Sequence, residues 1–252
     1  MRSTRLLRLA ASALLALAPL AASAQQITVS AAASLTDAFK ELAPKFEAGK
    51  PGVTVRLNFA ASGALLQQIA QGAPVDVFAS ADQDTMDRAT TQNLIDTATR
   101  RNFVTNSLVL IEPVQGGVGV KTLADLQGAS VRKIALGKTA TVPVGRYTQQ
   151  VLTAAQLWAP LEPKFVQADS VRQVLDYVSR GEVEAGFVYR TDAALMTDKV
   201  RVVLSPTTVT PVSYPIAVVA DSRQKNAARD FIAFIASDAA QQVLARYGFG
   251  KP

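Results

Sequence analysis

The sequence contains no cysteine and no histidine among its 252 residues. Without cysteine there is no disulfide, thiolate nucleophile, iron–sulfur ligand or cysteine-linked lipid. Without histidine there is no Ser-His-Asp triad, and zinc loses both of its usual ligand types. Hydrophobic residues make up 49% of the chain and charged residues 18%, which is close to the globular average and argues against disorder. The composition therefore predicts a globular protein that lacks most common enzyme chemistry.

The start of the chain has the pattern of an export signal. Three arginines lie within residues 2–8, residues 9–20 are almost wholly apolar, and residues 22–24 are Ala-Ser-Ala, a small-residue cleavage pattern. The uncharged run is shorter than the about 20 residues that a membrane-spanning helix needs, so an anchor is the weaker interpretation. We predict cleavage after Ala24 and a periplasmic location. Loss of the three arginines lowers the formal charge of +6, which weakens the case for a nucleic-acid partner.

Short β-rich runs alternate with helical patterns along the rest of the chain. The strand patterns cover residues 27–32, 53–59, 75–80, 103–111, 133–136, 185–189, 200–204 and 214–220. The helical patterns cover residues 36–48, 64–71, 83–91, 146–157, 171–179, 225–236 and 239–247. This alternation predicts an α/β fold with mainly parallel sheets flanked by helices.

Two predicted strands, 102–113 and 212–220, are longer than the usual length of about 5–6 residues. They suit crossings between two lobes, with the second lobe inserted into the first. On this interpretation residues 25–105 and 214–252 form lobe 1, and residues 106–213 form lobe 2. A single α/β domain fits the pattern equally well.

Small or hydroxyl-bearing residues stand at four strand-to-helix junctions: 34–37, 61–63, 142–145 and 169–171. In an open α/β sheet such junctions lie at the carboxyl ends of strands, where ligands bind. A helix start offers unpaired backbone N–H groups and a partial positive charge, and Ser34 and Ser62 add hydroxyl donors. Converging helix starts would form an anion site without lysine or arginine. Taken singly, each serine is also explained as a plain helix cap, and Tyr189 as a core residue.

Seven motifs, spread over the whole mature chain, resemble the periplasmic molybdate-binding proteins of ABC transporters. They are residues 27–36 (ITVSAAASLT), 72–82 (GAPVDVFASAD), 97–100 (TATR), 106–109 (NSLV), 186–189 (GFVY), 214–219 (YPIAVV) and 246–249 (RYGF). The resemblance implies a two-lobed type II periplasmic binding protein with a ligand cleft between its lobes. Such a protein closes on molybdate or tungstate and delivers it to an inner-membrane permease with its ATPase subunit.

The resemblance also implies the ligands of the oxyanion. Ser34 and Ser62 in lobe 1 correspond to hydroxyl and amide donors, Val144 and Val171 in lobe 2 to backbone amide donors, and Tyr189 to a hydroxyl donor. It implies no catalytic residue, no cofactor, no direct cation ligand, no nucleic-acid partner and a monomeric protein. Molybdenum would be bound as its oxyanion through the same five residues.

The chain departs from the family pattern at three places. Val144 stands where the family often has alanine, residues 61–63 stand where it has a serine run, and Ser170 precedes Val171 where some members have aspartate. Backbone donors tolerate such side-chain changes, so we expect the site to survive. Ser170 is itself a candidate donor.

A site made only of donors suits molybdate, because the tetrahedral dianion carries no proton and every oxygen accepts. Phosphate keeps a proton for much of the neutral range and gains from a carboxylate, and no carboxylate occupies a matched position, although Asp37 and Asp169 lie near in sequence. Sulfate is also proton-free, so a binding protein for sulfate or another tetrahedral oxyanion remains the alternative.

Two other classes fit the sequence less well. An exported hydrolase would need a lysine beside Ser34 or Ser62, and none is close in sequence. The sensing lobe of a transcription regulator is disfavoured by the export signal and by the lack of DNA-binding helices.

Overall fold

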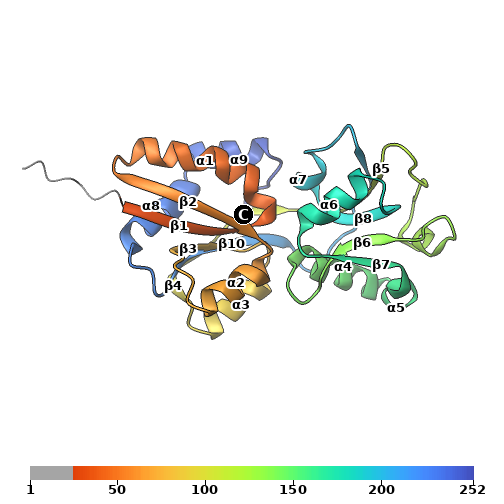
Figure 1. The fold of residues 1–252 in the computed structure, drawn as a ribbon, viewed down its shortest axis with the longest axis horizontal. Helices are drawn as coiled ribbons and strands as arrows, with labels where there is room; N and C mark the ends of the chain where they lie inside the picture. Colours follow the sequence, from red (N-terminus) through yellow and green to blue (C-terminus); the bar gives the residue numbers. More distant parts are fainter. Residues whose placement is uncertain (1–24) are drawn as a thin grey trace, which may run out of the picture.

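The computed structural model describes residues 25–252, so the predicted export signal lies outside the described residues. Two five-stranded sheets lie end to end along the long axis of the molecule (Figure 1). The first has the order β2-β1-β3-β10-β4 and consists of β1 (Gln25–Ala32), β2 (Val53–Ala60), β3 (Val77–Ala79), β4 (Ile95–Asn106) and β10 (Val212–Val219). The second has the order β7-β6-β8-β5-β9 and consists of β5 (Leu108–Pro113), β6 (Ile134–Gly137), β7 (Phe165–Ala168), β8 (Ala185–Tyr189) and β9 (Val200–Leu204).

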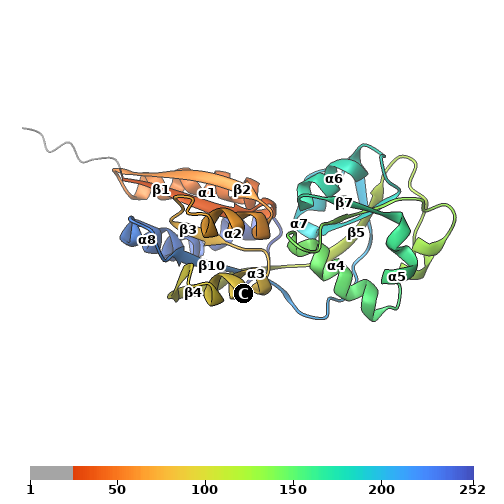
Figure 2. The ribbon, with the colours of Figure 1, turned by 60° about the horizontal axis from the view of Figure 1, so that its bottom comes forward.

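Helices cover both faces of each sheet (Figures 1 and 2). On the first sheet, α1 (Thr36–Gly49), α8 (Lys225–Ile235) and α9 (Asp238–Arg246) lie on one face, and α2 (Ser62–Ala70) and α3 (Gln83–Thr91) on the other. On the second sheet, α6 (Val171–Ser179) and α7 (Arg190–Ala193) lie opposite α4 (Pro143–Ala154) and α5 (Trp158–Leu161). Three short 3-10 helices complete the fold: η1 (Ala33–Leu35), η2 (Leu123–Gln127) and η3 (Glu162–Lys164). We call the first sheet with its helices lobe 1, and the second lobe 2.

The two-lobed α/β architecture confirms the predicted fold class, with one refinement. In each sheet two neighbouring strand pairs are parallel and two are antiparallel, so the sheets are mixed. The antiparallel pairs arise because β5 and β10, the strands next to the crossings between lobes, run against both of their neighbours.

The prediction of one long strand over 102–113 is wrong. β4 ends at Asn106 in lobe 1, and β5 begins at Leu108 in lobe 2. Ser107 between them belongs to neither strand; its N–H group donates to the side chain of Asn106 at 2.9 Å, and its carbonyl accepts the Arg190 N–H at 2.9 Å. The return crossing precedes β10, which pairs with β4 from Val212 onward. The lobe boundaries at 105/106 and 213/214 stay a prediction.

The four predicted junctions lie where parallel strands end. β1 leads into η1 and α1, β2 into α2, β6 into α4 and β7 into α6. α4 begins at Pro143 instead of Arg146, because proline is well suited to the first position of a helix. α6 begins at Val171 as predicted, and the Ser170 hydroxyl caps it by accepting the Gln173 N–H at 3.2 Å. The carboxyl ends of β1 and β2 thereby place η1 and the start of α2 at one edge of lobe 1.

Candidate functional site

Ser34 and Ser62 are buried at the edge of lobe 1 that faces lobe 2. Ser34 lies in η1, and its Oγ is 3.0 Å from the hydroxyl of Tyr214 on β10. Ser62 is the first residue of α2, and its Oγ accepts the N–H of Ala81 at 3.0 Å. Because that bond uses only a lone pair, the hydroxyl hydrogen of Ser62 is left to donate elsewhere.

The three lobe 2 residues also lie at element ends. Val144 is the second residue of α4 and Val171 the first residue of α6, so both backbone N–H groups belong to the first turn of a helix, where no intrahelical partner exists. Tyr189 is the last residue of β8 and is buried. Its hydroxyl donates to the carbonyl of Ala81 at a long 3.5 Å.

The structure brings these positions together along the boundary between the lobes. Ala81 contacts Ser62 through its N–H and Tyr189 through its carbonyl, and so joins the two lobes at one residue. The N–H of Gly63 donates to the carbonyl of Thr141, just before α4, at 2.9 Å. Helix α6, which starts with Val171, packs against η1, which contains Ser34. All five predicted residues therefore lie at the lobe boundary, and their contact with a ligand stays a prediction.

Gly63 is required for this approach of the lobes. A Cβ atom there would lie 2.6 Å from the Thr141 carbonyl oxygen and 2.8 Å from the Thr141 Cα. Both atoms are backbone, so they cannot move aside cheaply. Glycine in the predicted junction 61–63 thus permits the start of α2 to touch the segment that leads into α4.

Two ion pairs also cross the boundary, and no local sequence pattern predicts either. Arg146 on α4 donates from Nε and Nη2 to Oδ2 of Asp82 at 2.8 and 2.6 Å, and Nη2 also donates to the Thr85 hydroxyl at 2.7 Å. Asp82 caps α3 in lobe 1, and its side chain is only 4% exposed. The pair is therefore a buried, oriented contact that fastens lobe 2 to lobe 1.

The second ion pair centres on Arg172 of α6. Its Nε donates to Asp192 at 2.6 Å within lobe 2, and its Nη2 lies 2.8 Å from Oδ2 of Asp37 in lobe 1, close but not aligned for a hydrogen bond. Burial raises the pKa of the Asp192 carboxyl to about 6, against the opposing effect of Arg172. Asp37 lies in the first turn of its own helix, α1, and also faces the other lobe. Asp169 pairs with Lys138.

Two buried tyrosines near the boundary, Tyr189 and Tyr214, are neutral. Burial raises the pKa of Tyr189 and of Tyr214 well above the usual value of 10, so both keep their hydroxyl hydrogens at neutral pH. The rings of these two tyrosines contact each other edge to face, with centroids 5.9 Å apart. Sequence reasoning missed Tyr214 as a site neighbour although the motif 214–219 had drawn attention to it.

The arrangement can therefore hold an anion without offering it a free charge. The hydroxyl groups of Ser34 and Ser62 and the first turns of α2, α4 and α6 supply donors, and the Tyr189 hydroxyl becomes a further donor when it gives up its long bond to the Ala81 carbonyl. The nearby arginines Arg146 and Arg172 are neutralised by carboxylates. Because those carboxylates are already paired with cations, they do not offer the acceptor that a proton-bearing anion would use.

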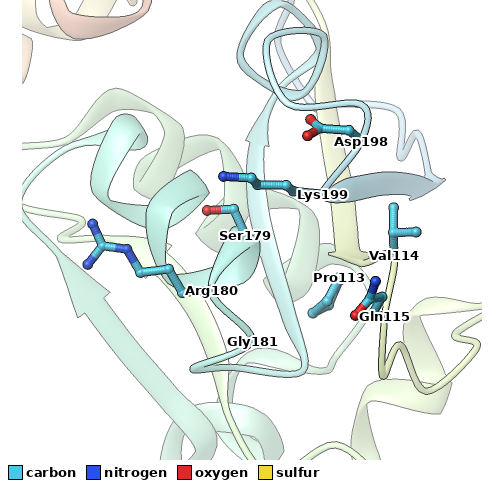
Figure 3. Close-up of a pocket in the computed structure, with 8 residues that line it drawn as sticks. All are labelled: Pro113, Val114, Gln115, Ser179, Arg180, Gly181, Asp198 and Lys199. Atoms are coloured by element: carbon cyan, nitrogen blue, oxygen red, sulfur yellow. The ribbon is translucent and has the colours of Figure 1, made fainter.

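A separate hollow of about 340 Å³ lies at the far end of lobe 2 (Figure 3). Arg180 and Gly181, after α6, form one side of it, and Val114 and Gln115, after β5, form the other. None of the five predicted residues lines it. Within residues 25–252, acidic side chains form no cluster that could hold a metal ion, and no helix has the length and apolar character needed to cross a membrane.

Comparison with known proteins places the chain in a family. The family model for bacterial extracellular solute-binding proteins matches residues 27–250. The molybdate-binding protein ModA of Escherichia coli K12 is 37% identical over 232 residues, covering 89% of this chain and 88% of the relative. ModA of Haemophilus influenzae is 34% identical over 232 residues, covering 90% and 91%.

A solved structure supports the same fold. The periplasmic molybdate-binding protein of Azotobacter vinelandii superposes with a TM-score of 0.75 at 24% identity, covering 90% of this chain and 99% of that one. At that identity the likeness concerns the fold alone. Because the family model and both ModA relatives match almost the whole of the described chain, this protein belongs to the bacterial extracellular solute-binding proteins, in the group that contains these molybdate-binding relatives.

Proposed function

We propose that this protein binds molybdate outside the cytoplasm and delivers it to an ABC permease for import. The observation that carries the proposal is the meeting of Ser62 and Tyr189, one from each lobe, at Ala81. A ligand held there touches both lobes, so binding is coupled to lobe closure. The relatives of the chain, which carry molybdate in their names, support this choice of oxyanion. Tungstate has the same charge and shape and is proposed as a second ligand.

The five residues have distinct roles in this proposal. Ser34 and Ser62 donate through hydroxyl and backbone groups, Val144 and Val171 through backbone N–H groups at helix starts, and Tyr189 through its hydroxyl. Each hydrogen bond to a charged group contributes about 1.5–3 kcal/mol. The seven bonds of this set would contribute about 10–20 kcal/mol in total, against an association cost of about 4–15 kcal/mol, so micromolar binding is attainable without a salt bridge.

We further propose that the protein is a periplasmic monomer, exported with cleavage after Ala24, and that its partners are an inner-membrane permease and its ATPase subunit. It needs no cofactor and performs no catalysis. A hydrolase would require a base beside one of the two serines, and their oxygens instead meet the Tyr214 hydroxyl and the Ala81 N–H.

A thermal-shift series with molybdate, tungstate, sulfate and phosphate tests the ligand. A ligand that binds only the folded state raises the melting temperature. At a thousandfold excess over its Kd it adds about 4 kcal/mol to the free energy of unfolding. We expect shifts with molybdate and tungstate at micromolar concentration and none with phosphate. A larger shift with sulfate than with molybdate would replace the proposal by its alternative, a sulfate-binding protein.

A further inference from the structure

A series of hydrogen-bonded polar side chains extends from Ser34; Ser34, Tyr214 and Thr191 are buried and Asn106 is half-buried. The Tyr214 hydroxyl lies 3.0 Å from Oγ of Ser34 and accepts a hydrogen bond from Nδ2 of Asn106 at 3.2 Å. Nδ2 of Asn106 also donates to the hydroxyl of Thr191, on α7 of lobe 2, at 2.9 Å. Tyr214 is completely buried, so water does not compete for its hydroxyl.

The direction of the hydrogen bonds in this chain is fixed by the backbone. The N–H group of Ser107 donates to Oδ1 of Asn106 at 2.9 Å, which identifies that atom as the amide oxygen. The opposite atom of the amide is then NH2, which can only donate. Its two hydrogens point to Thr191 and to Tyr214.

The orientation passes from Asn106 to Ser34 through the tyrosine. Asn106 Nδ2 can only donate, so the buried Tyr214 hydrogen cannot point back to it, and among the described residues Oγ of Ser34 is the other polar atom within hydrogen-bond distance of that hydroxyl. Donation to Oγ of Ser34 is therefore the arrangement that leaves the Tyr214 hydrogen with a partner. Burial raises the pKa of Tyr214 well above its usual value, so this hydrogen is present at neutral pH. With its lone pair occupied, Ser34 turns its own hydrogen away from Tyr214 and toward the boundary between the lobes.

We propose that Asn106 and Tyr214 are positioning residues that keep the Ser34 hydroxyl a donor toward the ligand, and so make the site selective for oxyanions that carry no proton. The inference rests on the proposed function. In the reversed arrangement Ser34 donates to Tyr214 and presents a lone pair to the ligand. A proton-free dianion is repelled by that lone pair, whereas hydrogenphosphate can donate to it. The hydrogen bonds from Asn106 through Tyr214 to Ser34 thus determine which kind of anion binds at the serine.

The substitution Asn106→Asp tests the direction of the hydrogen bonds from Asn106 through Tyr214 to Ser34. The carboxylate still accepts the Ser107 N–H but offers Tyr214 an acceptor in place of a donor, which reverses both bonds. We expect the affinity for molybdate, measured by titration calorimetry, to fall about 10- to 100-fold. The affinity for hydrogenphosphate, measured by its competition with molybdate, should fall much less. The ratio of the molybdate affinity to the phosphate affinity therefore falls.

A double-mutant cycle separates this effect from the added negative charge. Tyr214→Phe removes one oxygen atom, cuts the chain and leaves Ser34 free to donate, so we expect a loss of only two- to fivefold. In the Y214F background, N106D should cost at least threefold less affinity than in the unmodified protein. Asn102→Asp, an exposed change on the same strand, controls for net charge, and melting of each ligand-free variant checks the fold.

The outcomes are distinct. Equal losses from N106D with and without Tyr214 would show that charge alone acts and would overturn the proposed chain. An unchanged molybdate-to-phosphate ratio in N106D would overturn it as well. Failure of the unmodified protein to bind molybdate would instead overturn the proposed function, and this inference with it.

Discussion

Ser62 uses the two halves of its hydroxyl group for different partners. Its oxygen accepts the N–H of Ala81 at 3.0 Å, and its hydrogen remains for an oxyanion at the lobe boundary. Ser34 has the same division, with Tyr214 on the oxygen side. Each serine side chain is therefore already ordered by the protein, so ligand binding costs little further side-chain entropy there.

Removing either hydroxyl should weaken binding without unfolding the protein. We expect Ser34→Ala and Ser62→Ala each to raise the Kd for molybdate about 10- to 100-fold, because a hydrogen bond to a charged group contributes about 1.5–3 kcal/mol. Titration calorimetry measures the change. Ser237→Ala is the matched control, since Ser237 caps α9 by accepting the Ala240 N–H, and its loss should lower stability only. Unchanged affinity in both site variants would refute the assignment of the two serines.

Sequence reasoning reached the two serines but not their partners. A serine directly before an amphipathic pattern indicates a helix start, which is a local signal, so Ser34 and Ser62 could be selected from their neighbours. Tyr214 lies 180 residues from Ser34, and Asn106 lies 108 residues from Tyr214. No local pattern encodes such a pairing, because it depends on which strands become neighbours in the folded sheet.

At the level of elements, helices and strands were both predicted closely where the local signal is strong; β8 and β9 have the predicted bounds. α6 and α3 have the predicted bounds, since each carries a clear cap and an amphipathic repeat. β7 was missed because its four residues, Phe165–Ala168, are too few to show an alternating pattern. The division of 102–113 at Ser107 was missed because both halves favour strand, and only membership of different sheets separates them.

The contact between α6 and α7 gives the protein a specific pH dependence. Asp192, fully buried beside Arg172, has a pKa raised to about 6 in the folded protein, against 3.8 for an unperturbed carboxyl. The folded state therefore binds this proton more tightly than the unfolded state does. Its stabilising effect is complete below about pH 4 and is lost as the pH rises to about 6.

We expect the free energy of unfolding to fall by about 1–3 kcal/mol between these pH values through Asp192 alone. Urea unfolding followed by circular dichroism, at pH steps from about 4 to 7, measures it. Asp192→Asn lacks the titration, so its curve should be flatter over this range, whatever its absolute stability. The exposed carboxylate change Asp230→Asn is the control. Parallel curves for D192N and the unmodified protein would contradict the raised pKa.

At the scale of the molecule, the two sheets repeat one plan. Each has two parallel strand pairs on one side and two antiparallel pairs on the other, so each lobe presents helix starts at one sheet edge. The alternation of strands and helices predicted the helix starts at the carboxyl ends of parallel strands, but not the antiparallel pairs. It could not predict the contacts between lobes, because Arg146 and Asp82 lie 64 residues apart and meet only when the two edges face each other.

The Arg146–Asp82 pair should act on closure and not on the ligand. It links α4 to α3 across the boundary, so its loss destabilises the closed arrangement and lowers the fraction of protein that is competent to hold ligand. We expect Arg146→Gln to weaken the binding of molybdate and of tungstate by the same factor, about 3- to 30-fold, because lobe closure is common to both ligands.

Calorimetry with both oxyanions measures that factor, with Arg132→Gln as the control. Arg132 pairs with Glu184 inside lobe 2 with its side chain 81% exposed, so its loss should leave both affinities unchanged. A change in the molybdate-to-tungstate ratio in R146Q would mean that Arg146 senses the ligand itself. Unaltered affinities would mean that the pair forms with equal ease in the open and closed arrangements, so closure must then be driven by the ligand and the contacts at Ala81 and Gly63 alone.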